Sequence, residues 1–170
     1  LTGRPAEALA ACDRALALAP DYAEALTNRG AALQALGQCA EALASYDRAL
    51  ALNPRSATAL NNRGVVLKDL LRFEDALASI DAALAIRPSN AEAHCNRGNV
   101  LQKLGRFENA LASYDQALAI RPGDPIALMN RGNVLRELLR TEDALATLQQ
   151  SLLLKPDYAE AHYNLGLVFN

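Results

Sequence analysis

The sequence has few of the residues from which most active sites and metal sites are built. Its 170 residues contain no tryptophan, one methionine, two histidines and three cysteines. The cysteines, Cys12, Cys39 and Cys95, are odd in number and form no CxxC pair, which favours reduced or inert thiols and a cytoplasmic protein. His94 and His162 are 162 − 94 = 68 residues apart, whereas a metal pair needs neighbouring ligands. We therefore expect no metal, no cofactor and no catalytic residue.

The sequence also lacks a strong charge of one sign and a long apolar run. Its 17 basic and 19 acidic residues give a formal net charge of −2, which argues against nucleic acid or a membrane surface as the partner. No apolar run approaches the roughly 18 residues of a membrane span, and no signal peptide opens the chain. The first residue is Leu1, so we expect a segment of a longer protein.

Proline is scarce, but its positions are regular. Five of the seven prolines recur at intervals of 34 residues: Pro20, Pro54, Pro88, Pro122 and Pro156. With these prolines at place 32 of a 34-residue frame, residues 1–170 form a single array of repeats. The array divides into a partial repeat (1–22), four full repeats (23–56, 57–90, 91–124 and 125–158) and a final partial repeat (159–170).

Small and apolar residues recur at fixed places of the frame, at the three- and four-residue spacing of amphipathic helices. Place 8 is always glycine: Gly30, Gly64, Gly98, Gly132 and Gly166. Each repeat therefore predicts two helices. The first, or A helix, is expected over about 23–36, 57–70, 91–104, 125–138 and 159–169. The second, or B helix, is expected over about 5–18, 39–52, 73–86, 107–120 and 141–154. Gly37 and Gly105 are expected to cap two A helices, where Leu71 and Leu139 stand in the other repeats.

The 34-residue period, the glycine at place 8, the proline and the elements Ala42…Tyr46 and Ala110…Tyr114 resemble the tetratricopeptide repeat (TPR) family. The resemblance covers the whole chain. It implies an all-α fold, a superhelix or TPR solenoid of about ten helices in antiparallel pairs, with the A helices on the concave face. It also implies a protein–protein interaction scaffold that is not an enzyme and that binds an extended peptide or partner segment in the concave groove.

Asparagine occupies place 6 of every A helix: Asn28, Asn62, Asn96, Asn130 and Asn164. Asparagine costs several tenths of a kcal/mol in mid-helix relative to alanine, so each should have a compensating role. One reading is that the carboxamides hydrogen-bond the backbone of a bound peptide, together with Asn99 and Asn133 at place 9. The other reading is that they bond to neighbouring helices and fix the stacking of the repeats.

The Asn-x-Gly element also resembles the asparagine ladder of O-GlcNAc transferases and of related bacterial glycosyltransferases. This resemblance implies an alternative function, in which the chain is the substrate-recruiting arm of a larger enzyme. A different TPR binding mode, the carboxylate clamp of chaperone-tail adaptors, is not expected. Its place-2 lysine is absent, since that place holds Glu24, Thr58, Glu92, Ile126 and Glu160.

Arginine at place 7 and aspartate at place 25 change together along the chain. Place 7 is arginine in the first four A helices and leucine, Leu165, in the last. Place 25 is aspartate in the first four B helices and glutamine, Gln149, in the last. This pattern pairs each arginine with the aspartate sixteen residues earlier, in the preceding repeat. We expect four pairs that fix the register between repeats: Asp13–Arg29, Asp47–Arg63, Asp81–Arg97 and Asp115–Arg131.

Both partial repeats lack one helix of the pair, and no polar capping helix closes the array. The last helix carries an apolar set with no partner in the sequence: Tyr163, Leu165, Leu167, Val168 and Phe169. We expect this face to pack on a second molecule or on sequence beyond this segment. A third function therefore stays open, a self-assembly module that forms homo-oligomers through its uncapped terminal helices.

Overall fold

The computed structural model describes residues 4–169, and within this range it contains ten α-helices and no strand. The A helices are α2 (Ala23–Ala35), α4 (Ala57–Asp69), α6 (Ala91–Lys103), α8 (Pro125–Glu137) and α10 (Ala159–Val168). The B helices are α1 (Pro5–Leu18), α3 (Cys39–Leu52), α5 (Phe73–Ile86), α7 (Phe107–Ile120) and α9 (Thr141–Leu154). The predicted bounds agree with these to within one residue, so the expectation of an all-α chain of helix pairs is confirmed.

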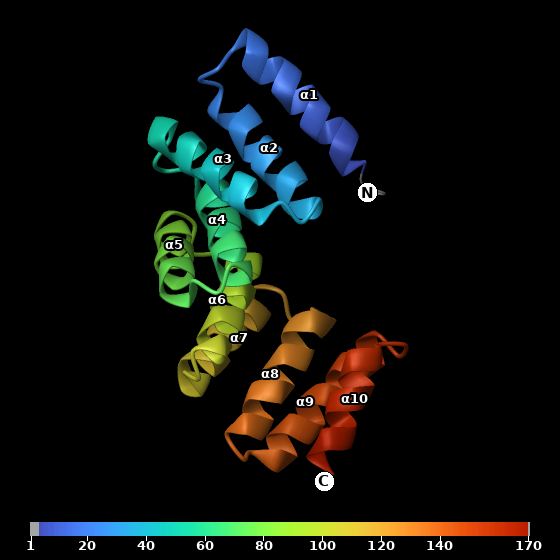
Figure 1. Cartoon of the computed structure of the whole chain (residues 1–170). Coiled ribbons are helices and arrows are strands. Elements are labelled where there is room, and N and C mark those ends of the chain that lie inside the picture. Colours follow the sequence, from blue (N-terminus) through green and yellow to red (C-terminus); the bar gives the residue numbers. More distant parts are fainter. Residues whose placement is uncertain (1–3, 170) are drawn as a thin grey trace. The chain divides into compact units, whose positions relative to one another are not determined.

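The helices, which are labelled in Figure 1, belong to two compact units. The first unit ends at Pro88 and contains α1–α5, and the second starts at Ser89 and contains α6–α10. In the first unit α2 packs on α3 and α4 on α5, and α2 also contacts α4. In the second unit α6 packs on α7 and α8 on α9, while α10 contacts both α8 and α9. Each A helix with a following partner therefore packs on its own B helix.

The A and B helices of a pair approach closely because place 8 has no side chain. The side chains that face these glycines, at place 24, are fully buried: Tyr46, Ile80, Tyr114 and Leu148. A Cβ atom added to Gly98 would lie 2.7 Å from the Tyr114 ring, well inside van der Waals contact. The ring thus fills the space that the missing side chain leaves.

The turns from A to B helix share one geometry although two different residues form them. Gly37 and Gly105 adopt φ of 76° and 69°, and Leu71 and Leu139 adopt φ of 61° and 59°. In both kinds of turn the next N–H bonds the carbonyl five residues earlier, as Arg72 does to Leu67 and Arg106 to Leu101 at 2.9 Å. Leucine therefore completes the same helix cap as glycine, in a left-handed conformation that disfavours a β-carbon.

Several A helices begin at a side chain that accepts backbone hydrogen bonds. Ser56, Asn90 and Asp124 each accept from the N–H three residues on, at 3.2–3.3 Å. These caps compensate orphan N–H groups at the start of α4, α6 and α8. No helix in the described range is both long enough and apolar enough to cross a bilayer.

Candidate functional site: the asparagine-bearing face of the A helices

The place-6 asparagines have the same register position in each of the five A helices. Asn28 is exposed, whereas the asparagines of the later A helices are half-buried: Asn62, Asn96, Asn130 and Asn164. Asn99 and Asn133, one turn further along α6 and α8, are also half-buried. We call these residues the asparagine face of each unit: Asn28 and Asn62 in the first unit, and Asn96, Asn99, Asn130, Asn133 and Asn164 in the second.

In the second unit the asparagine face contains a continuous hydrogen-bond chain. The hydroxyl of Tyr114 donates to Oδ1 of Asn99 at 2.7 Å, and Nδ2 of Asn130 donates to the same oxygen at 3.1 Å. The chain joins B helix α7 to A helices α6 and α8. Burial raises the pKa of Tyr114 well above its usual value, so the hydroxyl remains a donor at neutral pH. Asn99 is thereby held in one orientation.

Met129 connects two further members of this face. Its sulfur accepts from Nδ2 of Asn133, on the same helix, and from Nδ2 of Asn164 on α10, each at 3.2 Å. Oδ1 of Asn133 is buried and accepts no hydrogen bond from the residues that the structure describes. Since thioether sulfur is a weak acceptor, the Met129 contacts orient both carboxamides without satisfying them strongly.

In the first unit the face borders a polar hollow. A cavity of about 340 Å³ lies between the start of α2, the end of α3 and the start of α4. Its lining includes Glu24, Thr27, Asn28, Asn53 and Thr58, so donors and acceptors surround it. Asn28 is the residue that this hollow shares with the asparagine face.

In the first unit the hydroxyl of the buried Tyr46 contacts polar residues of two A helices. Its hydroxyl lies 3.4 Å from Oε1 of Gln34. Burial raises the pKa of Tyr46 to about 12, and a hydrogen bond to Asn62 partly opposes that rise. Asn62 in turn accepts from Nδ2 of Asn61 at 3.3 Å. Both units therefore contain a buried tyrosine whose hydroxyl reaches the polar residues of an A helix.

Three of the expected arginine–aspartate contacts are present. The Nε atoms of Arg29, Arg63 and Arg131 donate to Oδ1 of Asp13, Asp47 and Asp115, at 2.7, 2.6 and 2.7 Å. The remaining pair, Asp81–Arg97, joins residues of different units and stays a prediction. Each of the three contacts links a B helix to the A helix of the next repeat, which fits a role in register.

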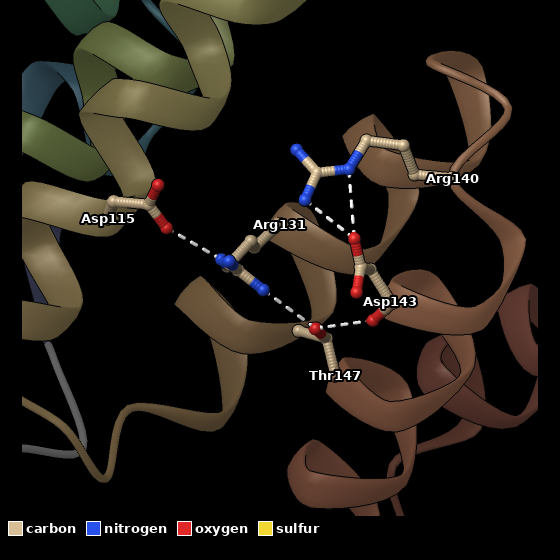
Figure 2. A network of polar contacts seen from close by, with 5 residues as sticks. All are labelled: Asp115, Arg131, Arg140, Asp143 and Thr147. Atoms are coloured by element: carbon tan, nitrogen blue, oxygen red, sulfur yellow. Dashed lines mark hydrogen bonds and ion pairs between the residues drawn. The ribbon is translucent and has the colours of Figure 1, made fainter.

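Sequence reasoning missed the second partner of these arginines. Nη1 of Arg131 donates to Oγ1 of Thr147 at 2.8 Å, and Thr147 donates in turn to the carbonyl oxygen of Asp143 (Figure 2). Arg29 and Arg97 bond Ser45 and Ser113 in the same way, at 2.8 Å. The signal was a column of hydroxyl residues at place 23. Arg29 and Arg131 thus each connect the preceding B helix to the B helix of their own repeat.

Two of the three thiols have a raised pKa. Burial raises the pKa of Cys95 to about 11 and also raises that of Cys12, so both thiols are protonated at neutral pH. Nε2 of His162 lies 2.8 Å from the carbonyl oxygen of Pro156. Among residues 4–169, no group of three or more His, Cys, Asp or Glu is placed to hold a metal ion.

Family models identify the repeats. Models described as tetratricopeptide repeat match residues 27–91 and 91–124, and one described as TPR repeat matches residues 132–170. Together these matches cover more than half of the sequence, and the chain belongs to the tetratricopeptide repeat family. A search of the curated proteins finds no match.

Solved TPR proteins share the fold. One, described as "YrrB: a TPR protein with an unusual peptide-binding site", is 26% identical, with a TM-score of 0.78 and coverage of 94% of this chain and 82% of that one. TTC0263, a thermophilic TPR protein of Thermus thermophilus, is 26% identical, with a TM-score of 0.81 and coverage of 98% and 91%. MamA of Desulfovibrio magneticus RS-1 is 22% identical, with a TM-score of 0.82 and coverage of 92% and 89%. The fold is that of a TPR solenoid, a protein-interaction scaffold.

Proposed function

We propose that the asparagine face binds an extended segment of a partner protein, mainly through the backbone of that segment. The observation that carries the proposal is the unbroken asparagine column on successive A helices. A carboxamide offers two N–H donors and an acceptor oxygen, so it matches the N–H and C=O of a peptide unit. Each such bond contributes roughly 0.5–1.5 kcal/mol net, so several together support an affinity near micromolar.

The inter-helix contacts of Asn99 are compatible with this role. Asn99 accepts two hydrogen bonds on Oδ1, and neither of these contacts uses its Nδ2 donors. Because the carboxamide is already fixed, a ligand that binds it loses less conformational entropy. The stacking role and the binding role are thus combined in Asn99 and Asn130.

The polar hollow beside Asn28 gives the first unit a place for a ligand side chain. The structural relative described as having an unusual peptide-binding site, at 26% identity, further supports a peptide ligand. The same binding mode would serve a substrate-recruiting arm of a larger enzyme, in which the groove holds the substrate rather than a stable partner.

The test uses unstructured dodecapeptides selected from a random library on the intact chain. Binding to the best peptide is then measured by calorimetry for the wild type, Asn28→Ala and Asn130→Ala. We expect each variant to weaken binding about 5- to 10-fold, because each removes one ligand bond. The matched control is Asn109→Ala on α7, an exposed asparagine of a B helix that lies outside the face.

A second measurement separates backbone recognition from side-chain recognition. N-methylation of a single contacted peptide amide should weaken binding about 5- to 10-fold, whereas alanine substitution of a peptide side chain should have a smaller effect. If no peptide is selected, or if Asn28→Ala and Asn130→Ala bind as the wild type does, the asparagine column serves stacking alone and the proposal fails.

A further inference from the structure

The polar hollow of the first unit carries a single charge, and that charge is negative. Among the described residues that line it, only Glu24, in the first turn of α2, is ionisable, and the others are neutral. Oε2 of Glu24 accepts a hydrogen bond from the hydroxyl of Tyr22 at 3.4 Å, and Glu24 forms no ion pair with the residues that the structure describes. The carboxylate therefore lines the hollow without a cation beside it.

The neutral lining adds hydrogen-bond acceptors to this charge. Thr27 donates its hydroxyl proton to the carbonyl oxygen of Ala23 at 3.0 Å, so its oxygen can only accept from a ligand. Thr58, which lines the hollow from α4, is exposed and offers a second hydroxyl oxygen. A carboxylate together with hydroxyl oxygens matches a cation that has several N–H donors. A guanidinium has five such donors in a planar fork, so the lining favours arginine.

The second unit contains the equivalent place, and there the chain itself supplies an arginine. Place 31 is basic in the last three full repeats: Arg87, Arg121 and Lys155. In the first full repeat this place is Asn53, which lines the hollow. Nη1 of Arg121 donates to Oδ2 of Asp124 at 3.4 Å, and Asp124 is the N-cap of α8. The hollow therefore lacks a cation that its counterpart in the second unit contains.

Arg121 lies among the counterparts of the residues that line the hollow. Glu92 and Cys95 hold places 2 and 5 of their repeat, the places of two lining residues. Burial is the main cause of the raised pKa of Cys95, the carboxylates of Asp124 and Glu92 add to the rise, and the guanidinium of Arg121 opposes it. All three charged groups thus lie near one thiol. The helix ends at this place, which correspond to those around the hollow, do not exclude a guanidinium.

We propose that the polar hollow binds an arginine side chain of the partner segment, with its guanidinium against Glu24, at the place that Arg121 occupies in the second unit. The inference rests on the proposed function, because Asn28 belongs both to the hollow and to the asparagine face. The asparagines recognise the peptide backbone without reading its sequence, and the hollow adds one sequence-specific contact. The ligand is then an extended segment with an arginine at one fixed position.

Parallel selections from one random dodecapeptide library test this specificity. The wild type should select peptides that have arginine at one fixed position. Asn53→Arg introduces the place-31 arginine of the second unit into the hollow, so it should select peptides that lack the fixed arginine. Asn109→Arg is the matched control, because it adds the same charge at an exposed asparagine of α7, outside the hollow, and it should select as the wild type does.

Calorimetry with the best wild-type peptide then measures the contact itself. Replacing the peptide arginine by citrulline, which has a similar shape and no charge, should weaken binding about 5-fold, the upper range for an ion pair at an exposed carboxylate. Glu24→Gln should weaken binding of the arginine peptide by a similar factor and should make the two peptides bind alike. Glu41→Gln, which removes an exposed carboxylate of α3 outside the hollow, should bind both peptides as the wild type does.

The outcomes separate this inference from the proposed function. The inference is overturned if the selected peptides share no fixed arginine, or if Glu24→Gln discriminates arginine from citrulline as strongly as the wild type does. In either case, weaker binding by Asn130→Ala would still support the asparagine face. If none of the chains selects a peptide, the proposed function and this inference both fail. Circular dichroism confirms that each variant folds.

Discussion

In the α6–α7 pair the ring of Tyr114 lies against Gly98, whereas Cys12 of α1 holds the same place as Tyr114 with no A helix of its own repeat over it. Tyr114 is 0% exposed and Cys12 is half-buried. The residue at this place is thus buried by the A helix of its own repeat. Stability in such an array is the sum of repeat and interface contributions, so the interior and the two ends should respond differently to the same substitution.

The largest contrast is expected between alanine substitutions at two glycines of place 8. Gly98→Ala should destabilise the chain by about 3 kcal/mol, because the new Cβ would lie 2.7 Å from a ring whose hydroxyl is held by Asn99. Gly166→Ala should stabilise α10 by about 0.5 kcal/mol, because alanine favours helix and the position is open. Urea unfolding followed by circular dichroism measures both. Equal effects at the two glycines would contradict the contrast.

The buried tyrosines predict a second difference, which appears at high pH. The pKa of Tyr46 is raised from 10.0 to about 12, so the protonated form is favoured in the folded state. The free energy of folding that depends on protonated Tyr46 is fully present below pH 10 and is lost as the pH rises from 10 through 12. By linkage the loss reaches roughly 2–3 kcal/mol. Thermal unfolding from pH 8 to pH 12 should show the chain weaken over this window.

Tyrosine-to-phenylalanine variants identify the groups responsible. Tyr46→Phe and Tyr114→Phe should each lessen the alkaline loss, whereas the control Tyr22→Phe, at a half-exposed ring, should leave it unchanged. At neutral pH Tyr114→Phe should cost about 1 kcal/mol and Tyr46→Phe less, since their hydroxyls lie 2.7 and 3.4 Å from their acceptors. If Tyr46→Phe and Tyr114→Phe both lose stability at high pH as the wild type does, groups other than these tyrosines cause the loss.

The turns provide a third and smaller comparison. Leu71→Gly should stabilise the chain by about 1 kcal/mol, since leucine is strained at φ 61° and its side chain is 74% exposed. Gly105→Leu makes the reverse change at φ 69° and should destabilise by a similar amount. Paired urea unfolding curves measure the two effects, and effects of the same sign would exclude backbone strain as their cause.

Helix positions were predictable because the signals are local and repeated. Each proline of the series lies in a linker from B to A helix, and place 8 marks the close approach of two helices. The repeated frame therefore placed every helix to within one residue. The turn at Leu71 shows the limit. The sequence indicated a missing glycine there, but only the coordinates show that leucine adopts the same left-handed conformation.

The candidate site was less accessible to sequence reasoning. The contacts of Arg29, Arg63 and Arg131 with aspartate could be predicted because places 7 and 25 change together along the sequence, which is a pairwise signal. The contacts of Asn99 with Tyr114 and of Asn164 with Met129 have no such signal, because places 5, 9 and 24, which hold Met129, Asn99 and Tyr114, vary from repeat to repeat. They depend on the distance between helices and on side-chain orientation, which the sequence pattern does not specify.

The smallest effect is expected at the arginine–aspartate contacts, and here the end and the interior should agree. Asp13–Arg29 at α1 and Asp115–Arg131 in the second unit have the same length of 2.7 Å, and both aspartates are about half-exposed. Asp13→Asn and Asp115→Asn should therefore each cost about 0.5 kcal/mol, and 1 M salt should reduce both costs. Arg131→Met should cost more than Asp115→Asn, because it also leaves the Thr147 hydroxyl without its donor. A cost above about 2 kcal/mol for Asp115→Asn alone would mean that the contact acts as a buried pair that fixes register, and not as a surface contact that follows from it.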